Sequence, residues 1–215
     1  MVKVKSEIRA IIFDVGGVLS LGKYEEKGVG GHHLLGVHNF MADVFHIDLD
    51  TWFDAIDTSY AKSIEGKINR RKALYIMASN LKCSVGNLEK LFKTAYGEHF
   101  KRNNELYKVA YGLREKGYRI GILSDQWYLS KEALILQKDI KGFRPVIISC
   151  DVGMRKPNPN IYKLLLKKLR LPGKKVLFID NREWNLRSAR ELGMKTILFE
   201  DNKQLIRDLE NKGIL

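Results

Sequence analysis

Cysteine is scarce in this sequence, and long apolar runs are absent. The two cysteines among its 215 residues, Cys83 and Cys150, lie in unrelated contexts and lack the spacing of metal ligands. No apolar run approaches the roughly 20 residues that a membrane-spanning helix needs. Residues 1–5 lead into the first predicted strand, residues 7–13, without an apolar signal-peptide segment. We therefore expect a reduced, cytoplasmic protein with no membrane partner.

Acidic residues are outnumbered, because 25 Asp and Glu face 38 Lys and Arg, which gives a net charge of +13. A basic chain favours anionic ligands and makes nucleic acid a candidate partner. The basic residues are interleaved with acids along the whole chain, however, and there is no basic tail. We therefore interpret the charge as a solvated surface and do not expect nucleic acid binding. The sequence does not determine the oligomeric state.

The chain is organised around one stretch near its N-terminus. Residues 11–13 are apolar and lead into Asp14, and Gly16 and Gly17 follow almost at once. This pattern is typical of a buried strand that carries a carboxylate at its C-terminal end and then turns tightly. Ligands of open α/β sheets bind beyond the carboxyl ends of the strands, so Asp14 is a candidate site residue. An aspartate that only caps a turn is the alternative.

Apolar residues recur at helical spacing from about residue 40 to 100. The pattern breaks in the middle, and Asn69 is placed to cap the helix that follows the break. We expect the aromatic residues Trp52, Phe53 and Tyr60 to belong to the core of this block. The sequence therefore predicts a helical insert of roughly 80 residues between two α/β segments.

Strands and helices alternate through the second half of the chain. Strands are predicted at 118–123, 146–149, 176–179 and 196–199. Runs of Val, Ile and Leu that alternate with helices predict a parallel sheet with both faces covered. The predicted fold is α/β, a doubly wound, Rossmann-like parallel sheet with a helical domain inserted after the first strand. The predicted domains are a core of residues 1–20 and 101–215 and a helical cap of residues 21–100.

Chemically useful side chains gather where the predicted strands end. Asp14 follows the first strand, Ser124 ends the second, Asp180 ends the fourth, and Lys156 precedes the start of a helix. Two carboxylates can hold Mg²⁺, and a hydroxyl, a lysine and loop N–H groups can hold phosphate oxygens. A carboxylate beside metal and phosphate can act as a nucleophile. These residues therefore suggest phosphoryl transfer to an aspartate.

Four segments in this order resemble the motifs of the haloacid dehalogenase-like (HAD) superfamily, and the resemblance runs from residue 8 to about residue 200. Four motifs in order, each at a strand end or a helix start, are more specific than any one of them. The helical block resembles the class I cap, which covers the site and selects substrates in that family. The four segments are residues 13–19, 122–125, 153–162 and 176–181.

The resemblance implies a role for each matched residue. Asp14 would be the nucleophile that forms an aspartyl-phosphate, Ser124 would hydrogen-bond the phosphoryl group, and Lys156 would offset charge between the two. Mg²⁺ would be held by Asp14, Asp180 and the backbone carbonyl of Gly16. The phosphate-binding residues would be Val15, Gly16, Ser124, Asp125 and Lys156, with the backbone N–H groups of Val15, Gly16 and Asp125 lining the cradle.

Two positions depart from the pattern of the family's phosphatases. Gly16 stands where most of them carry a second aspartate, which protonates the leaving group and then activates water. General acid–base help is worth roughly 10²–10⁴-fold, so slow turnover is expected. Asn181 stands where a second acid is usual, which weakens the metal site without removing an oxygen that can accept a hydrogen bond. Candidates to replace the missing acid are Asp125, Glu183, His32 and His33.

The leading hypothesis is a Mg²⁺-dependent HAD-like hydrolase, a phosphatase of a small phosphorylated metabolite. The alternative is a HAD-like protein that binds a phosphorylated ligand or a partner with little or no turnover, which Gly16 and Asn181 motivate. A 2-haloacid dehalogenase ranks lower. Such enzymes also lack the second aspartate, but they work without metal and lack the acid that Asp180 supplies here.

Overall fold

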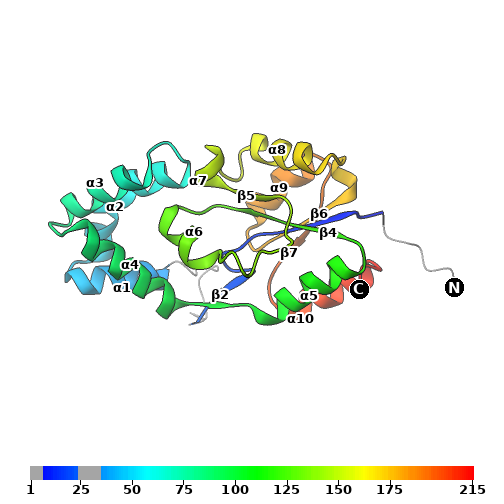
Figure 1. The fold of residues 1–215 in the computed structure, drawn as a ribbon, viewed down its shortest axis with the longest axis horizontal. Coiled ribbons are helices and arrows are strands. Elements are labelled where there is room, and N and C mark those ends of the chain that lie inside the picture. The colour runs from blue at the N-terminus through cyan, green and yellow to red at the C-terminus, as the bar shows by residue number, and fades with distance from the viewer. Residues whose placement is uncertain (1–6, 24–34) are drawn as a thin grey trace.

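A computed structural model describes residues 7–23 and 35–215, and its central element is a five-stranded parallel sheet (Figure 1). Strand β1 lies in the middle, paired with β4 on one side and β6 on the other, in the order β5-β4-β1-β6-β7. The strands are β1 (Ala10–Phe13), β4 (Arg119–Ser124), β5 (Val146–Ile148), β6 (Val176–Asp180) and β7 (Lys195–Leu198). The predicted parallel sheet is confirmed.

Both faces of the sheet are covered because the strands are apolar on both sides. In β1, Ile11 and Phe13 pack into one cluster, while Ala10 and Ile12 pack into another. The first cluster takes in helices α5 (Asn104–Glu115) and α10 (Asn202–Asn211). The second takes in α8 (Pro159–Leu169) and α9 (Glu183–Glu191). Asn158 caps α8 by accepting a hydrogen bond from the N–H of Asn160.

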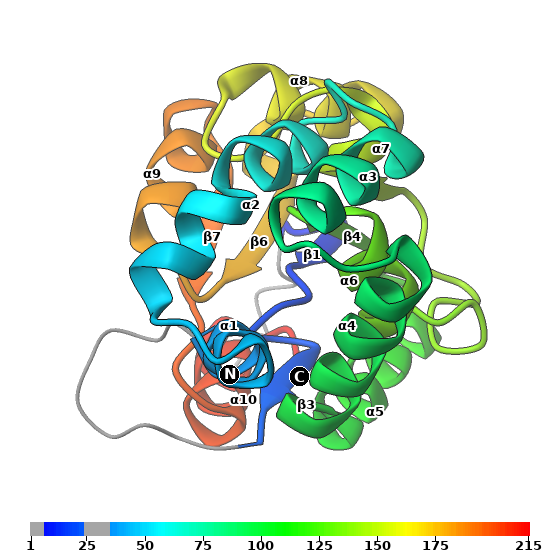
Figure 2. The same ribbon diagram turned by 90° about the vertical axis from the view of Figure 1, so that its left-hand side faces the viewer.

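Four helices between β1 and β4 form a separate block, which Figure 2 shows in front of the strands. They are α1 (Leu35–Phe45), α2 (Leu49–Ile64), α3 (Arg70–Asn80) and α4 (Val85–His99). The predicted helical insert is therefore present. The break in the pattern is the loop between α2 and α3, where Gly66 has a φ of 64° and Asn69 caps α3. A Cβ at Gly66 would lie 2.6 Å from the carbonyl oxygen of Cys150, so only glycine fits this contact.

The helical block has its own apolar core, and the α/β part contributes to it. Trp52 lies fully buried in this core, and so does Trp127, which comes from the segment after β4. Trp127 donates its indole N–H to the Tyr96 hydroxyl at 2.7 Å. The helical block is therefore fastened to the loop that follows β4. The boundaries 1–20, 21–100 and 101–215 stay predictions.

Two short helices and one pair of strands are not among the predicted elements. An antiparallel pair, β2 (Ser20–Gly22) and β3 (Phe100–Arg102), joins the two ends of the helical block to the core. Helices α6 (Tyr128–Leu134) and α7 (Ser149–Val152) follow β4 and β5. Both lack a side chain that caps their N-terminus, which removes the usual sequence signal for a helix start. Within the described ranges no helix is long and apolar enough to cross a membrane.

Candidate functional site

The C-terminal ends of three neighbouring strands bring the predicted residues together. Asp14 follows β1, and its N–H donates to the carbonyl of Ile179 in β6 at 2.9 Å. Ser124 ends β4 and Asp180 ends β6, on either side of β1. The chain turns away after Asp14 through Gly17, whose φ of 81° explains the glycine there. The two carboxylates and the hydroxyl therefore share one edge of the sheet, as predicted.

Lys156 lies between the two carboxylates and is almost completely buried. Its ammonium group is 2.6 Å from Asp180 Oδ2 and 3.1 Å from Asp14 Oδ1, and it also donates to the carbonyl of Leu123 at 3.3 Å. Burial alone would lower the pKa of Lys156. The carboxylates of Asp14, Asp180 and Asp125 outweigh burial and hold that pKa above its usual value. Lys156 is therefore a charged group fixed between two acids.

Asp180 is fully buried and held by several donors. Its oxygens accept from the N–H of Arg182 at 2.8 Å and from the side-chain amide of Asn185 at 3.1 Å, in addition to Lys156. The carbonyl of Asn185 in turn accepts from the Tyr162 hydroxyl at 2.8 Å. This network fixes the direction of the Asp180 carboxylate at the end of β6.

The loop after β4 presents Ser124, Asp125 and Gln126 to the same place. Asp125 accepts a hydrogen bond from the N–H of Lys156 at 3.0 Å, and Gln126 donates its side-chain amide to Ser124 Oγ at 3.0 Å. Burial raises the pKa of Asp125 to about 6, and the charge of Lys156 opposes that rise. Ser124 thus receives a hydrogen bond while its own hydroxyl proton remains available to a ligand.

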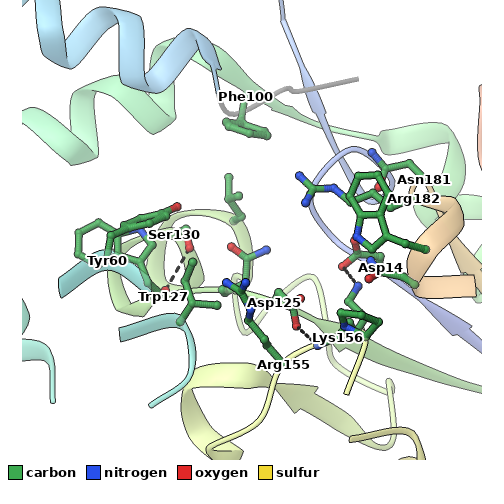
Figure 3. Close-up of a pocket in the computed structure, with 17 residues that line it drawn as sticks. Asp14, Tyr60, Phe100, Asp125, Trp127, Ser130, Arg155, Lys156, Asn181 and Arg182 are labelled. Atoms are coloured by element: carbon green, nitrogen blue, oxygen red, sulfur yellow. Dashed lines mark hydrogen bonds and ion pairs between the residues drawn. The ribbon is translucent and has the colours of Figure 1, made fainter. Parts of the chain in front are cut away.

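A cavity of about 190 Å³ opens beside these residues (Figure 3). Asp14 and Lys156 line it on the side of the sheet, and Tyr60, Phe100 and Trp127 line it on the side of the helical block. Tyr60 packs against the helical core, as predicted, and it also lines the cavity. The other lining residues are Gly16, Ile64, Asp125, Gln126, Ser130, Leu134, Arg155, Pro157, Asn181, Arg182, Trp184 and Asn185.

Backbone N–H groups at the predicted phosphate cradle are unused within the described ranges. The amides of Val15, Gly16 and Asp125 donate to no described residue, although the carbonyl of Val15 accepts from Val18 and Ser20. Free N–H groups beside a turn form a concave site for an anion. The three amides that the family resemblance assigns to a phosphate cradle are therefore free to serve one.

Two buried oxygens suit a hard cation. Both Asp14 Oδ1 and Asn181 Oδ1 are buried. The first has the Lys156 ammonium at 3.1 Å as its ion-pair partner, and the second has no hydrogen-bond donor among the described residues. Mg²⁺ takes oxygen ligands, often one or two carboxylates together with waters. No group of three or more His, Cys, Asp or Glu within residues 7–23 and 35–215 could hold a metal. The oxygen donors that are present, two carboxylates, an amide and a carbonyl, nevertheless fit Mg²⁺.

The position of Gly16 has room for a side chain. A Cβ built there would meet only the amide nitrogen of Gln126, at an ordinary 3.8 Å, and the backbone does not have a positive φ. The missing acid is therefore not excluded by crowding. Gln126, which fills the neighbouring space, was not among the predicted site residues, although it directly follows Ser124 and Asp125 at a strand end.

The candidates for a replacement acid differ in position. Asp125 lines the cavity, whereas Glu183 is half-exposed at the start of α9, pairs with Arg190 and does not line the cavity. His32 and His33 lie outside the described residues. His38, the third histidine of that region, is buried in the helical core and accepts from the Trp52 indole at 3.0 Å. Asp125 is thus the described candidate nearest the chemistry.

Sequence reasoning missed three residues at the cavity rim, namely Arg155, Arg182 and Trp184. Arg155 stands next to Lys156, and the other two follow Asp180 within four positions. The signal that could have found them is their place beside matched motif residues. Their side chains could not be oriented without the structure.

Comparisons with known proteins agree with this geometry. A family model described as haloacid dehalogenase-like hydrolase matches residues 8–193. Bifunctional epoxide hydrolase 2 of Sus scrofa is 29% identical over 94% of this chain, which spans 38% of that protein's length. Glyceraldehyde 3-phosphate phosphatase of Pyrococcus abyssi is 37% identical over 45% of this chain and 41% of its own length.

A solved structure shares the fold across nearly the whole chain. It is a HAD family enzyme from Bacteroides thetaiotaomicron in complex with magnesium and inorganic phosphate. The match has a TM-score of 0.71 and 21% identity, and it covers 93% of this chain and 100% of that one. Together with the parallel sheet and the residues at its C-terminal edge, these findings establish that the chain belongs to the haloacid dehalogenase-like hydrolase family.

Proposed function

We propose that this hydrolase is a Mg²⁺-dependent phosphatase that acts on a small phosphorylated substrate through a phosphoryl group carried by Asp14. The observation that carries the proposal is the position of Asp14. Its Oδ1 is buried and lies 3.1 Å from the Lys156 ammonium, and Asp14 lines the cavity beside the unused amides of Val15, Gly16 and Asp125. A carboxylate that lies beside a cation and faces an anion site is suited to attack phosphorus.

In the first step, a carboxylate oxygen of Asp14 forms a bond to phosphorus while the bond from phosphorus to the leaving oxygen breaks. Lys156 offsets the negative charge of Asp14 and of the phosphoryl oxygens. Ser124 and the amides of Val15, Gly16 and Asp125 donate to those oxygens. In the second step, water attacks phosphorus, phosphate departs, and Asp14 is restored.

Mg²⁺ would be held by the carboxylates of Asp14 and Asp180 and by the carbonyl of Gly16, with the Asn181 amide oxygen beside them. When bound, the ion offsets charge on the phosphoryl group. The relatives and neighbours support this reading, since one is named a glyceraldehyde 3-phosphate phosphatase and one holds magnesium and phosphate.

We further propose that the helical block serves as a cap of class I. Tyr60 of α2 and Phe100 of β3 line the cavity above Asp14, so residues of this block contact whatever the cavity holds. The cavity is smaller than the roughly 300–1,000 Å³ typical of sites for drug-sized ligands. A small substrate therefore fits better than a large one.

Removal of the metal tests the proposal. Phosphate release from an aryl phosphate is expected with Mg²⁺, to be lost in excess chelator and to return when Mg²⁺ is added back. An aryl phosphate has a good leaving group, so it needs little help from an acid. Release that continues in chelator at the same rate would contradict the proposal.

The same assay separates the alternatives. Absence of release, together with Mg²⁺-dependent binding of phosphate esters, would favour a binding protein, the reading that Gly16 and Asn181 motivate. Chloride release from 2-haloacids in the presence of chelator would favour a dehalogenase.

Replacing Gly16 by aspartate is expected to supply the missing acid. Hydrolysis of an alkyl phosphate should rise at least tenfold, because general acid–base help is worth roughly 10²–10⁴-fold and the site has room for a Cβ. Hydrolysis of an aryl phosphate should change little. Gly16→Asn is the matched control, since it adds the same bulk without an acid. An equal rise in both variants, or none in either, would contradict the prediction.

A further inference from the structure

Two arginines at the cavity are not used by the proposed phosphoryl chemistry. Arg155 precedes Lys156 on the loop between α7 and α8, and Arg182 lies at the N-terminal end of α9. Lys156 already has Asp14 and Asp180 as ion-pair partners. The positive charge of the arginines therefore comes in addition to the charge that the carboxylates balance.

Arg182 has no acidic partner within the described ranges. Its backbone is fixed because its N–H donates to Asp180 at 2.8 Å. Its guanidinium carbon lies 5.4 Å from the centre of the Trp184 ring, a contact that orients the side chain at the rim. The Arg182 guanidinium is half-buried, lines the cavity and is not paired with a carboxylate of a described residue, so it can bind an anion.

Arg155 is only weakly paired. Its Nε lies 3.7 Å from the carboxylate of Glu65, which is also paired with Lys67. Its two terminal nitrogens make no hydrogen bond to a described residue. Because Glu65 pairs with two cations, Arg155, Lys67 and Glu65 together carry a net positive charge at this side of the cavity.

Both arginines lie on the helical side of Asp14. In Figure 3 the Arg182 side chain extends toward Phe100 and the Arg155 side chain toward Trp127, both away from the ion pair of Asp14 and Lys156. Their effect on Tyr60 agrees with this placement. Burial raises the pKa of the Tyr60 hydroxyl to about 12, and the charges of Arg182 and Arg155 oppose that rise. The charges of both guanidinium groups therefore reach the side of the cavity that Tyr60 lines.

We propose that Arg155 and Arg182 bind a second anionic group of the substrate, a carboxylate or a second phosphate, so that the enzyme prefers small phosphate esters that carry such a second anionic group. This inference rests on the proposed phosphatase function. Guanidinium groups suit both anions, because their planar donors pair with two oxygens at once. The cavity volume of about 190 Å³ limits the spacer between the two groups to a few carbons.

The test compares three-carbon phosphate esters with and without a second anionic group. Phosphoglycerate carries a carboxylate where glycerol phosphate carries an uncharged hydroxymethyl group, and propanediol bisphosphate carries a second phosphate. We expect kcat/KM of the wild type to be at least tenfold higher for phosphoglycerate or for propanediol bisphosphate than for glycerol phosphate. Which one is favoured identifies the anion.

Arginine variants then test which residues cause the substrate preference. Arg182→Gln and Arg155→Gln should each reduce that ratio several-fold and leave kcat/KM for glycerol phosphate within about threefold. Arg187→Gln, at an exposed position of α9, is the matched control and should leave the ratio unchanged. Equal wild-type rates on all three substrates would overturn the inference. So would an equal loss on all substrates in Arg182→Gln, which would assign the arginine to the phosphoryl group itself.

A binding measurement keeps the inference separate from the proposed function. If the wild type releases no phosphate from any ester, the phosphatase proposal fails. Calorimetry of the Asp14→Asn variant with Mg²⁺ then compares binding of phosphoglycerate, propanediol bisphosphate and glycerol phosphate. Tighter binding of phosphoglycerate or propanediol bisphosphate than of glycerol phosphate, with the difference lost in Arg182→Gln, would support the second anion site. Equal binding of all three would overturn it.

Discussion

Replacing Lys156 by methionine is expected to lower the free energy of unfolding by about 3–5 kcal/mol, because breaking a buried ion pair leaves an uncompensated charge. Lys156 is 3% exposed and contacts two carboxylates, of which Asp180 is fully buried and Asp14 is 7% exposed. Methionine has a similar length and no charge, so it removes the cation without leaving a large void. The same change should abolish phosphatase activity, since Lys156 is ion-paired with Asp14.

Urea denaturation of the wild type and the variant measures the loss of stability. Lys163→Met is the matched control, because Lys163 is exposed on α8 and its replacement should cost little. Metal-free conditions keep Mg²⁺ from substituting for the missing ammonium charge. A Lys156→Met variant within 1 kcal/mol of the wild type would show that the carboxylates are neutralised in another way.

Much of the fold could be predicted because the apolar patterns are long and regular. The strands at the centre of the sheet are continuous apolar runs, and the turn after β1 contains Gly17, which has a positive φ. Asn69 caps the helix that it is predicted to cap. These signals are local, so they can be read without tertiary contacts.

The elements that were missed depend on contacts distant in the sequence. Helix α6 has seven residues and no capping side chain, and it is held by Trp127 in the core of the helical block and by Tyr128, which donates to the carbonyl of Ile68. The pair β2 and β3 joins segments about 80 residues apart in the chain, which no local pattern encodes.

The candidate site likewise has residues that could be predicted from the sequence and residues that could not. Asp14, Ser124 and Asp180 follow from the rule that ligands bind at the C-terminal edge of a parallel sheet. The direction of the Arg182 side chain and the place of Tyr60 at the cavity depend on how the helical block lies over the sheet. Their roles as substrate contacts, like the roles of the predicted residues, stay proposals.

Replacing Asp14 by asparagine is the most direct test of the phosphoryl-transfer mechanism. The amide is nearly the same size as the carboxylate but cannot attack phosphorus, so the loss of a covalent nucleophile applies in full. Lys156 keeps its ion pair with Asp180 at 2.6 Å, and the variant should therefore remain folded. Asp54→Asn, at an exposed position of α2, is the matched control.

The measurement is the rate of phosphate release from an aryl phosphate in Mg²⁺ for the wild type and both variants. We predict that Asp14→Asn loses at least about a thousandfold in rate while Asp54→Asn retains the wild-type rate. Phosphate release by folded Asp14→Asn within tenfold of the wild type would contradict a mechanism in which Asp14 carries the phosphoryl group.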